Sequence, residues 1–147
     1  MLTKLEEEKF LPVPTQEQVI QFCHENTIID FLGVEVVPTA DGCARLELDV
    51  KECHSNPYGI LHGGVLTTMA DTAMGAACLM RNKKVVTVSI TLEFMHPVPL
   101  STRIITDAKI LNEGNHVFVC ECELVDADKK IYAKAHAVFF AISKLIE

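Results

Sequence analysis

The sequence predicts a single α+β domain in which an antiparallel sheet packs around one long helix. Three observations support this fold class: a near-apolar stretch at helical spacing over 60–80, four β-rich runs after it, and two more before it. A helix that is apolar nearly all round must be buried, so the sheet is expected to wrap around it. The 147 residues are enough for one core but not comfortably for two.

Periodicity and turn signals place the individual elements. Thr15 and Gln18 resemble a capping box at the start of a short amphipathic helix. Asp41-Gly42, between two β-rich runs, is a strong hairpin signal. The run 86–95 alternates strictly between apolar and polar residues. The predicted elements are a short helix over about 15–26, strands over 31–38 and 43–50, the long helix over 63–80, and strands over 86–95, 102–111, 116–125 and 131–142.

Composition and charge exclude several classes of function. The net charge of −7 and the lack of a basic run argue against a nucleic-acid partner. Residues 1–14 have no apolar signal core, so the protein is expected to be cytoplasmic. They are expected to form a lead-in to a single domain over 15–147. The six cysteines form no CxxC pair, which favours reduced thiols. His54 and His62 lack metal-ligand spacing, and the polar residues within 60–80 argue against a membrane span.

The long helix carries the residues that suggest chemistry. Asp71 is the lone carboxylate in the stretch 60–80, and a buried acid needs a partner, a proton or a chemical role. His62-Gly63-Gly64 stands at the entry to the same helix, where unpaired N–H groups and a partial positive charge attract a ligand oxygen. Gly63 N–H is therefore a candidate oxyanion donor, and Asp71 is a candidate base or nucleophile.

The rise of the helix separates these two groups. Eight residues rise about 12 Å, whereas acyl transfer needs the carboxylate and the oxyanion donor within roughly 3 Å of one reacting group. One copy of the helix cannot supply both, but two antiparallel helices of a two-fold dimer can. The site is therefore predicted to be shared, with Gly63 of one chain facing Asp71 of the other. Gly64, Thr68 and Gly75 are small and share the face of Asp71, so another group can approach it closely.

Structural roles for the same residues remain open at this point. Asp71 could bond to a backbone turn or to a threonine. His62 could cap the helix or belong to the core. Asn56 could merely shape the Asn-Pro turn that precedes the helix.

The combination of motifs is nevertheless specific. Asn56, Gly59, His62-Gly63-Gly64 and then Asp71 together resemble the active-site signature of hot dog fold thioesterases of the phenylacetate-degradation type. The run 87–97, which ends in Phe-x-x-Pro, resembles the central strand of that family, and the resemblance spans from about residue 28 to the C-terminus. It implies the hot dog fold, a dimer with a continuous sheet that usually pairs into a tetramer, and hydrolysis of acyl-CoA thioesters without metal or organic cofactor.

The resemblance also implies roles for the matched positions: Asp71 as general base or nucleophile, Gly63 N–H as the donor to the thioester oxygen, and Asn56 and His62 as groups that orient water or the thioester. The family often has a strand hydroxyl that contacts the base or the water. Counting back from Pro97 places it on Thr87, and counting forward from Asp71 places it on Ser89. We prefer Thr87, because Ser89 would shift Phe-x-x-Pro out of register. The two-residue period predicts that both hydroxyls lie on one face of the strand.

The substrate is expected to bind along the long helix. The acyl chain would run between this helix and its neighbour in the dimer, over Gly75 and Ala76, with the CoA end on the surface. The predicted substrate-binding residues are Gly64, Thr68, Gly75, Ser89, Arg81 and Arg103, the two arginines serving with Lys83 and Lys84 as cations for the CoA phosphates. A non-catalytic acyl-CoA-binding module is the alternative function, although such a binder gains nothing from Asp71. A hydratase is disfavoured because its expected Asp-His motif is missing.

Overall fold

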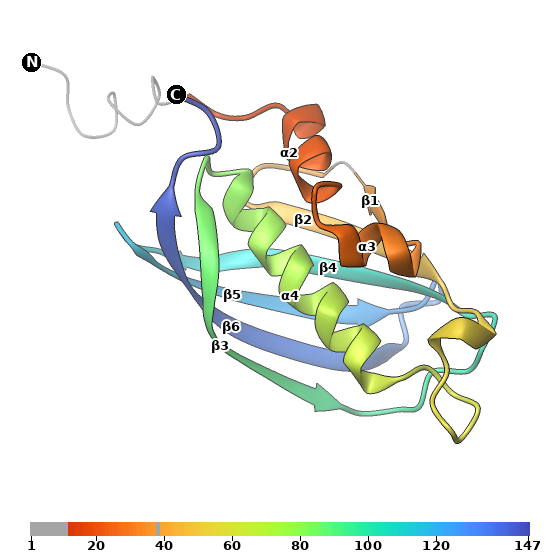
Figure 1. Cartoon of the computed structure of the whole chain (residues 1–147). Coiled ribbons are helices and arrows are strands. Elements are labelled where there is room, and N and C mark those ends of the chain that lie inside the picture. The colour runs from red at the N-terminus through yellow and green to blue at the C-terminus, as the bar shows by residue number, and fades with distance from the viewer. Residues whose placement is uncertain (1–11, 38) are drawn as a thin grey trace, which may run out of the picture.

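The computed structural model describes residues 12–37 and 39–147, and it confirms the α+β architecture. A six-stranded antiparallel sheet in the order β1-β2-β4-β5-β6-β3 curves around one long helix, as Figure 1 shows. The elements are α2 (Gln16–Cys23), α3 (Thr27–Leu32), β1 (Glu35–Val37), β2 (Cys43–Asp49), the 3-10 turn η1 (Glu52–His54), α4 (Gly63–Leu79), β3 (Lys84–Phe94), β4 (Arg103–Glu113), β5 (Val117–Val125) and β6 (Ile131–Ser143).

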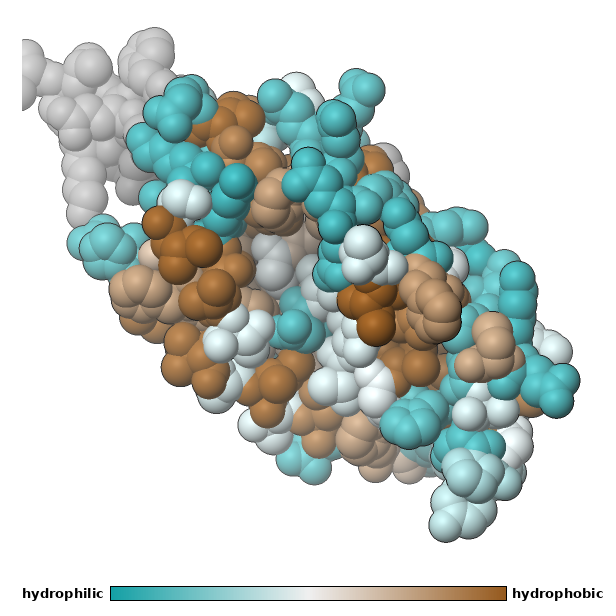
Figure 2. Space-filling model, viewed as in Figure 1, coloured by the Kyte–Doolittle hydropathy of each residue, from teal (hydrophilic) through white to brown (hydrophobic). Residues whose placement is uncertain are grey.

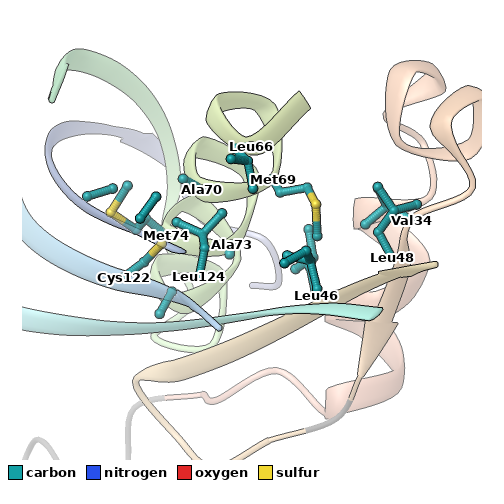
Figure 3. Packing of buried hydrophobic residues seen from close by; sticks show 14 of the residues in the cluster. Val34, Leu46, Leu48, Leu66, Met69, Ala70, Ala73, Met74, Cys122 and Leu124 are labelled. Atoms are coloured by element: carbon teal, nitrogen blue, oxygen red, sulfur yellow. The ribbon is translucent and has the colours of Figure 1, made fainter. Parts of the chain in front are cut away.

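The core lies between α4 and the concave side of the sheet, as Figure 3 shows. Residues that recur every three to four positions along α4 form one apolar stripe. Their exposed fractions are 3% or less: Leu66, Met69, Ala70, Ala73 and Met74. The strands cover only this side of α4, because Gly64 is exposed and Asp71 is half-buried on the other. The expectation that the helix is buried all round is therefore wrong for the single chain.

The N-terminal helices cover part of α4 that the sheet leaves open. The capping box predicted for α2 is confirmed, with Gln18 N–H donating to Thr15 Oγ1 at 3.1 Å and Thr15 N–H donating to Gln18 Oε1 at 2.9 Å. Val19 and Cys23 are buried against the C-terminal half of α4, in a cluster with Ala76. Residues 1–11, most of the predicted lead-in, lie outside the described residues.

The predicted strand over 31–38 is wrong over its first part. Residues Thr27–Leu32 form α3, and the strand β1 covers only Glu35–Val37. The helix buries Ile29 completely in the core and ends at Gly33, whose positive φ of 78° suits a glycine. Packing of one side chain thus overrides the β-favouring composition of this segment.

An irregularity in β3 overturns a second expectation. The predicted strict alternation breaks between Thr87 and Ser89, where Thr87 pairs with Phe139 but Ser89 pairs with Val138. Since Val138 and Phe139 are neighbours on β6, their side chains point to opposite faces of the sheet. Thr87 therefore lies on the face toward α4, and Ser89 lies on the outer face. The extra residue is Val88, which is typical of a β-bulge.

β3 is also an edge strand of the sheet. It has 11 residues and, among the described strands, pairs only with β6. Val88 and Phe94 on this strand have exposed fractions of 63% and 56%. A long apolar edge of this kind is typical of a surface that pairs with another strand.

No helix in the described part of the chain has both the length and the apolar character needed to span a membrane.

Candidate active site

Asp71 is held by a single hydrogen bond from the neighbouring strand. Thr87 Oγ1–H donates to Asp71 Oδ1 at 2.6 Å, a short distance typical of a bond to a carboxylate. Within the described residues, Asp71 Oδ2 accepts no hydrogen bond, so it is free to act on a ligand. Ser89 lies on the opposite face of β3, so the bulge decides which strand hydroxyl reaches the carboxylate.

The loop before α4 places a second set of polar groups at the helix N-terminus. His62 Nδ1 accepts a hydrogen bond from Gly64 N–H at 2.7 Å and so caps the helix. A Cβ added to Gly64 would lie 2.9 Å from His62 Nδ1, so this cap needs glycine there. The neutral ring carries its proton on Nε2, since Nδ1 is the acceptor. Gly63 N–H has no acceptor anywhere in residues 12–37 and 39–147, which leaves it free for a ligand oxygen.

Asn56 combines the two roles that its sequence context left open. Its Oδ1 accepts from the backbone N–H groups of Tyr58 at 2.9 Å and Ile60 at 3.3 Å, which shapes the turn. Its Nδ2 donates to no described acceptor. Asn56 and Gly63 line one cavity of about 270 Å³, together with Phe94 at the end of β3. The side chain therefore both builds the turn and offers a donor beside the helix end.

The two halves of the predicted site lie in different cavities of one chain. Asp71 and Thr87 line a second cavity of about 260 Å³, whereas Asn56 and Gly63 line the first. This separation follows from the rise of about 12 Å between positions 63 and 71. A single chain therefore presents the carboxylate and the helix N-terminus as two incomplete halves.

The small residues on α4 have different surroundings in the structure. Gly75 lines the cavity of Asp71. Thr68 Oγ1–H donates to the Gly64 carbonyl at 2.9 Å, back along its own helix. Ala76 is only 2% exposed and lies beneath α2 of the same chain. Gly75 and Ala76, over which the acyl path is predicted, therefore both line the cavity of Asp71, and α2 of the same chain packs against Ala76 there.

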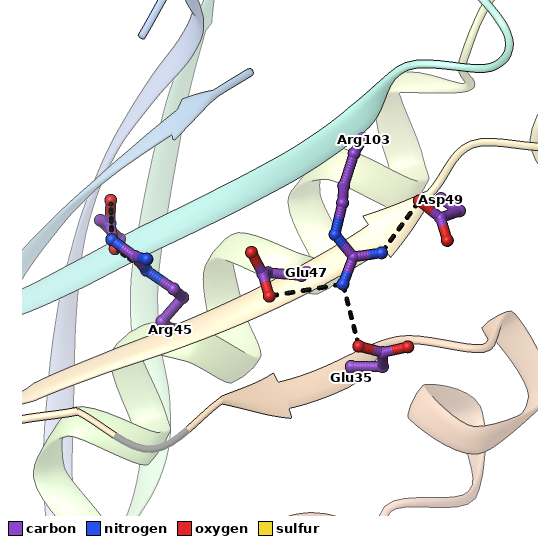
Figure 4. A network of polar contacts seen from close by, with 6 residues as sticks. Glu35, Arg45, Glu47, Asp49 and Arg103 are labelled. Atoms are coloured by element: carbon purple, nitrogen blue, oxygen red, sulfur yellow. Dashed lines mark hydrogen bonds and ion pairs between the residues drawn. The ribbon is translucent and has the colours of Figure 1, made fainter. Parts of the chain in front are cut away.

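The two predicted arginines lie outside both cavities and have acidic partners. Figure 4 shows Arg103 on β4 paired with Glu35 at 2.9 Å, Glu47 at 3.4 Å and Asp49 at 2.9 Å. These carboxylates raise the pKa of the Arg103 guanidinium. The role of the two arginines in CoA binding stays a prediction, and it requires the CoA phosphates to replace these carboxylate partners.

Arg81 is paired in the same way beyond the end of α4. Its Nη1 lies 3.0 Å from Asp41 Oδ2, and its Nε lies 3.2 Å from Glu113 Oε2. By contrast, Lys84 lines the cavity of Asp71, with its Nζ 4.9 Å from the centroid of the Phe22 ring.

Sequence reasoning missed the residues that α2 and the N-cap of α3 contribute to the cavity of Asp71. Phe22, Cys23 and Asn26 line the cavity of Asp71 although they lie about 50 residues before it in the chain. Burial raises the pKa of the Cys23 thiol to about 11, so this group stays protonated at neutral pH and is a poor nucleophile. No local pattern signals these contacts, because they arise from the packing of α2 on α4.

His54 is a further residue to which sequence reasoning gave no role at the site. It is 3% exposed, its Nδ1 accepts from Lys51 N–H at 2.9 Å, and its Nε2–H donates to the Leu32 carbonyl at 2.7 Å. It also accepts His62 N–H at its carbonyl, 2.9 Å away. His54 therefore positions the loop that leads into α4. Among the described residues, no three His, Cys, Asp or Glu side chains come together as a metal site would need.

Comparisons with known proteins agree with this fold and identify the family. The model of the thioesterase superfamily matches residues 58–133. A putative esterase of Saccharolobus solfataricus is 30% identical over 138 residues, which cover 92% of this chain and 96% of that protein. The acyl-coenzyme A thioesterase PaaI of Escherichia coli is 26% identical over 111 residues, which cover 73% of this chain and 79% of that one. The crystal structure of a Haemophilus influenzae thioesterase superposes with a TM-score of 0.78 at 26% identity, covering 92% of this chain and 95% of that one. The chain therefore belongs to the thioesterase superfamily and has the hot dog fold.

Proposed function

We propose that this thioester hydrolase cleaves acyl-CoA at a site that two copies of the chain build together. The observation that carries the proposal is the Asp71–Thr87 pair at 2.6 Å, which leaves one carboxylate oxygen free toward a cavity. The free Gly63 N–H, in the other cavity, is the complementary half. Since one chain holds them apart, the reacting thioester needs Asp71 from one copy and Gly63 from the other.

The open edge of β3 offers a way to bring the halves together. On this strand, Thr87 lies beside Asp71, to which it donates a hydrogen bond. Phe94, at the other end of the strand, lies beside Gly63, since a Cβ at Gly63 would be 3.4 Å from the Phe94 ring. An antiparallel pair of β3 strands with its two-fold axis at Thr91 would pair residues that face the same side of the sheet, and the bulge at Val88 would bring Thr87 opposite Phe94 of a second copy. The pairing would continue the sheet across the dimer and create two identical sites.

The chemistry follows from these groups. Gly63 N–H would polarise the thioester carbonyl and hold the oxyanion that forms. In the general-base route, Asp71 Oδ2 takes a proton from water while the water oxygen bonds to the carbonyl carbon. In the nucleophilic route, Oδ2 itself bonds to that carbon, and water then cleaves the mixed anhydride. In both routes the C–S bond breaks, and CoA leaves as a thiolate that takes up a proton.

The remaining polar groups would position the reactants. Thr87 fixes the orientation of the carboxylate, and Asn56 Nδ2 and His62 Nε2–H offer donors beside the helix end. The E. coli relative, named an acyl-coenzyme A thioesterase, supports acyl-CoA as the substrate class.

The first experiment removes the carboxylate. Asp71→Asn keeps an oxygen that can accept from Thr87 but loses the base, and Asp71→Ala removes both. We expect both variants to keep the fold and the dimer and to lose thiol release by about 100-fold or more on acetyl-, octanoyl-, palmitoyl- and phenylacetyl-CoA. Near-normal turnover in either variant would contradict the assignment. Tight acyl-CoA binding by the wild type without thiol release would instead favour a non-catalytic binding module.

The second experiment tests whether the site is shared. Two differently tagged chains, one with Asp71→Asn and one with Gly63→Pro, are co-expressed and the mixed dimer is purified through both tags. One site then carries both changes and the other carries neither, so about half of the wild-type activity per dimer is expected. Each homodimer should be inactive. An inactive mixed dimer would show that each site belongs to a single chain.

A further inference from the structure

The cavity that begins at Asp71 continues along α4 beneath the N-terminal helix. Four elements form its walls: α2 with Phe22, α4 with Gly75, β3 with Lys84, and β6 with Phe139 and Ile142. Figure 2 shows apolar side chains on both sides of the strip that runs over α4, between the β3 side and the N-terminal helices. The cavity volume of about 260 Å³ is close to that of a small-molecule pocket.

Two independent paths give the length of this cavity. Along α4, the eight residues from Asp71 to Leu79 rise about 12 Å. Along β3, the three residues from Thr87 back to Lys84 span about 10 Å. Since C–C bonds are about 1.5 Å long, an extended alkyl chain advances about 1.3 Å per carbon. The cavity therefore matches a chain of about eight to nine carbons measured from the carboxylate.

Phe22 lines the far end of the cavity. Lys84 Nζ lies 4.9 Å from the centroid of its ring, which places the ring at the Lys84 end of the cavity, away from Asp71. The floor is kept open by Gly75, where an added Cβ would meet only Phe139 Cε1, at 3.9 Å. Beyond Asp71, Thr87 and their neighbours, the lining is mainly apolar, as an alkyl chain requires.

We propose that this cavity holds the acyl chain and that Phe22 is the specificity-determining residue that limits its length. The substrates are then medium-chain acyl-CoA thioesters, with the thioester at Asp71 and the methyl end against Phe22. The inference rests on the proposed thioesterase function and adds to it a boundary set by the chain's own N-terminal helix.

The test compares chain-length profiles of kcat/KM on saturated acyl-CoAs of two to sixteen carbons. For the wild type, kcat/KM should rise about fourfold per methylene buried and stop rising near eight to nine carbons. Phe22→Ala should move this limit to longer chains and raise kcat/KM for tetradecanoyl-CoA at least tenfold. Phe31→Ala is the matched control, because Phe31 is 86% exposed on α3 and does not line the cavity.

A second variant acts in the opposite direction. Gly75→Ala adds a methyl group to the cavity floor without a clash and favours the helix. It should lower kcat/KM about tenfold for octanoyl-CoA and much less for acetyl-CoA, whose two-carbon acyl group is too short to fill the cavity. This variant also keeps the test valid if Phe22→Ala does not fold.

The outcomes separate the two proposals. If the wild type hydrolyses no acyl-CoA, the proposed function fails, and the length limit is then measured as dissociation constants of the same acyl-CoAs by calorimetry. If the wild type hydrolyses them but Phe22→Ala, Gly75→Ala and Phe31→Ala share its length profile, the role of Phe22 is refuted. Dissociation constants that do not depend on chain length would refute it as well.

Discussion

Replacing Gly63 by proline would delete one backbone donor at the start of α4. Gly63 is the first residue of α4, a position where proline is well tolerated because its missing N–H has no partner within the helix. The preceding His62 has φ −64° and ψ 129°, the extended conformation that a residue before proline prefers. Gly63→Pro therefore removes the proposed oxyanion donor while the backbone keeps its course.

The expected loss of kcat is measured relative to a matched variant, Gly63→Ala. Gly63→Ala keeps the N–H and adds a Cβ that would lie 3.4 Å from Phe94 Cε1 and Cζ, so it measures the steric part of the change. Loss of one oxyanion donor lowers kcat by about 100- to 1000-fold, or about 2.7–4 kcal/mol of transition-state stabilisation. We expect Gly63→Pro to lose this factor relative to Gly63→Ala.

The assay is steady-state thiol release from an acyl-CoA that the wild type hydrolyses. Circular dichroism and thermal unfolding of both variants verify that α4 is intact. A Gly63→Pro variant with kcat within a few-fold of Gly63→Ala would refute the oxyanion role, because the two variants differ chiefly in the N–H group.

Three further predictions concern Thr87, His54 and Cys23. Thr87→Val should lower kcat about tenfold or more, because it removes a hydrogen bond to a carboxylate. Ser89→Ala, on the outer face of β3, should leave kcat as it is. Equal losses of kcat in steady-state assays would argue against the bulge as the feature that selects Thr87. His54→Ala should lower the free energy of unfolding by about 1–3 kcal/mol in urea titrations, because it leaves the part-buried Lys51 N–H and Leu32 carbonyl without their partner. A loss below about 0.5 kcal/mol would show that the loop does not depend on His54. The free energy of unfolding should fall as pH rises from about 9 to about 11, since burial raises the pKa of Cys23 to about 11 while the unfolded chain already ionises near its ordinary value. This contribution is fully present below pH 9, and a Cys23→Ala variant with an unchanged pH slope would exclude that thiol as the cause.

Local patterns were sufficient where a feature depends on neighbours in the chain. The capping box at Thr15, the turn at Gly42 and the span of α4 all follow from short-range hydrogen bonds and helical periodicity. The helical rise also predicted that Gly63 and Asp71 lie apart in one chain, and they line different cavities. Residues 31 and 32 show the limit of such reasoning, because they were predicted to begin a strand but instead end α3, a helix that buries Ile29 in the core.

What the sequence by itself determined is the kind of chemistry: a lone carboxylate on an apolar helix, a free N–H at its start, and a distance that one helix cannot close. The tertiary structure alone decided that Thr87 rather than Ser89 meets Asp71, because the bulge in β3 reverses the faces of the strand. It also decided that Phe22 lines the cavity of Asp71 and that Arg103 has three carboxylate partners. These contacts join segments far apart in the chain, and their geometry depends on how the sheet pairs and how α2 packs, which no local pattern encodes.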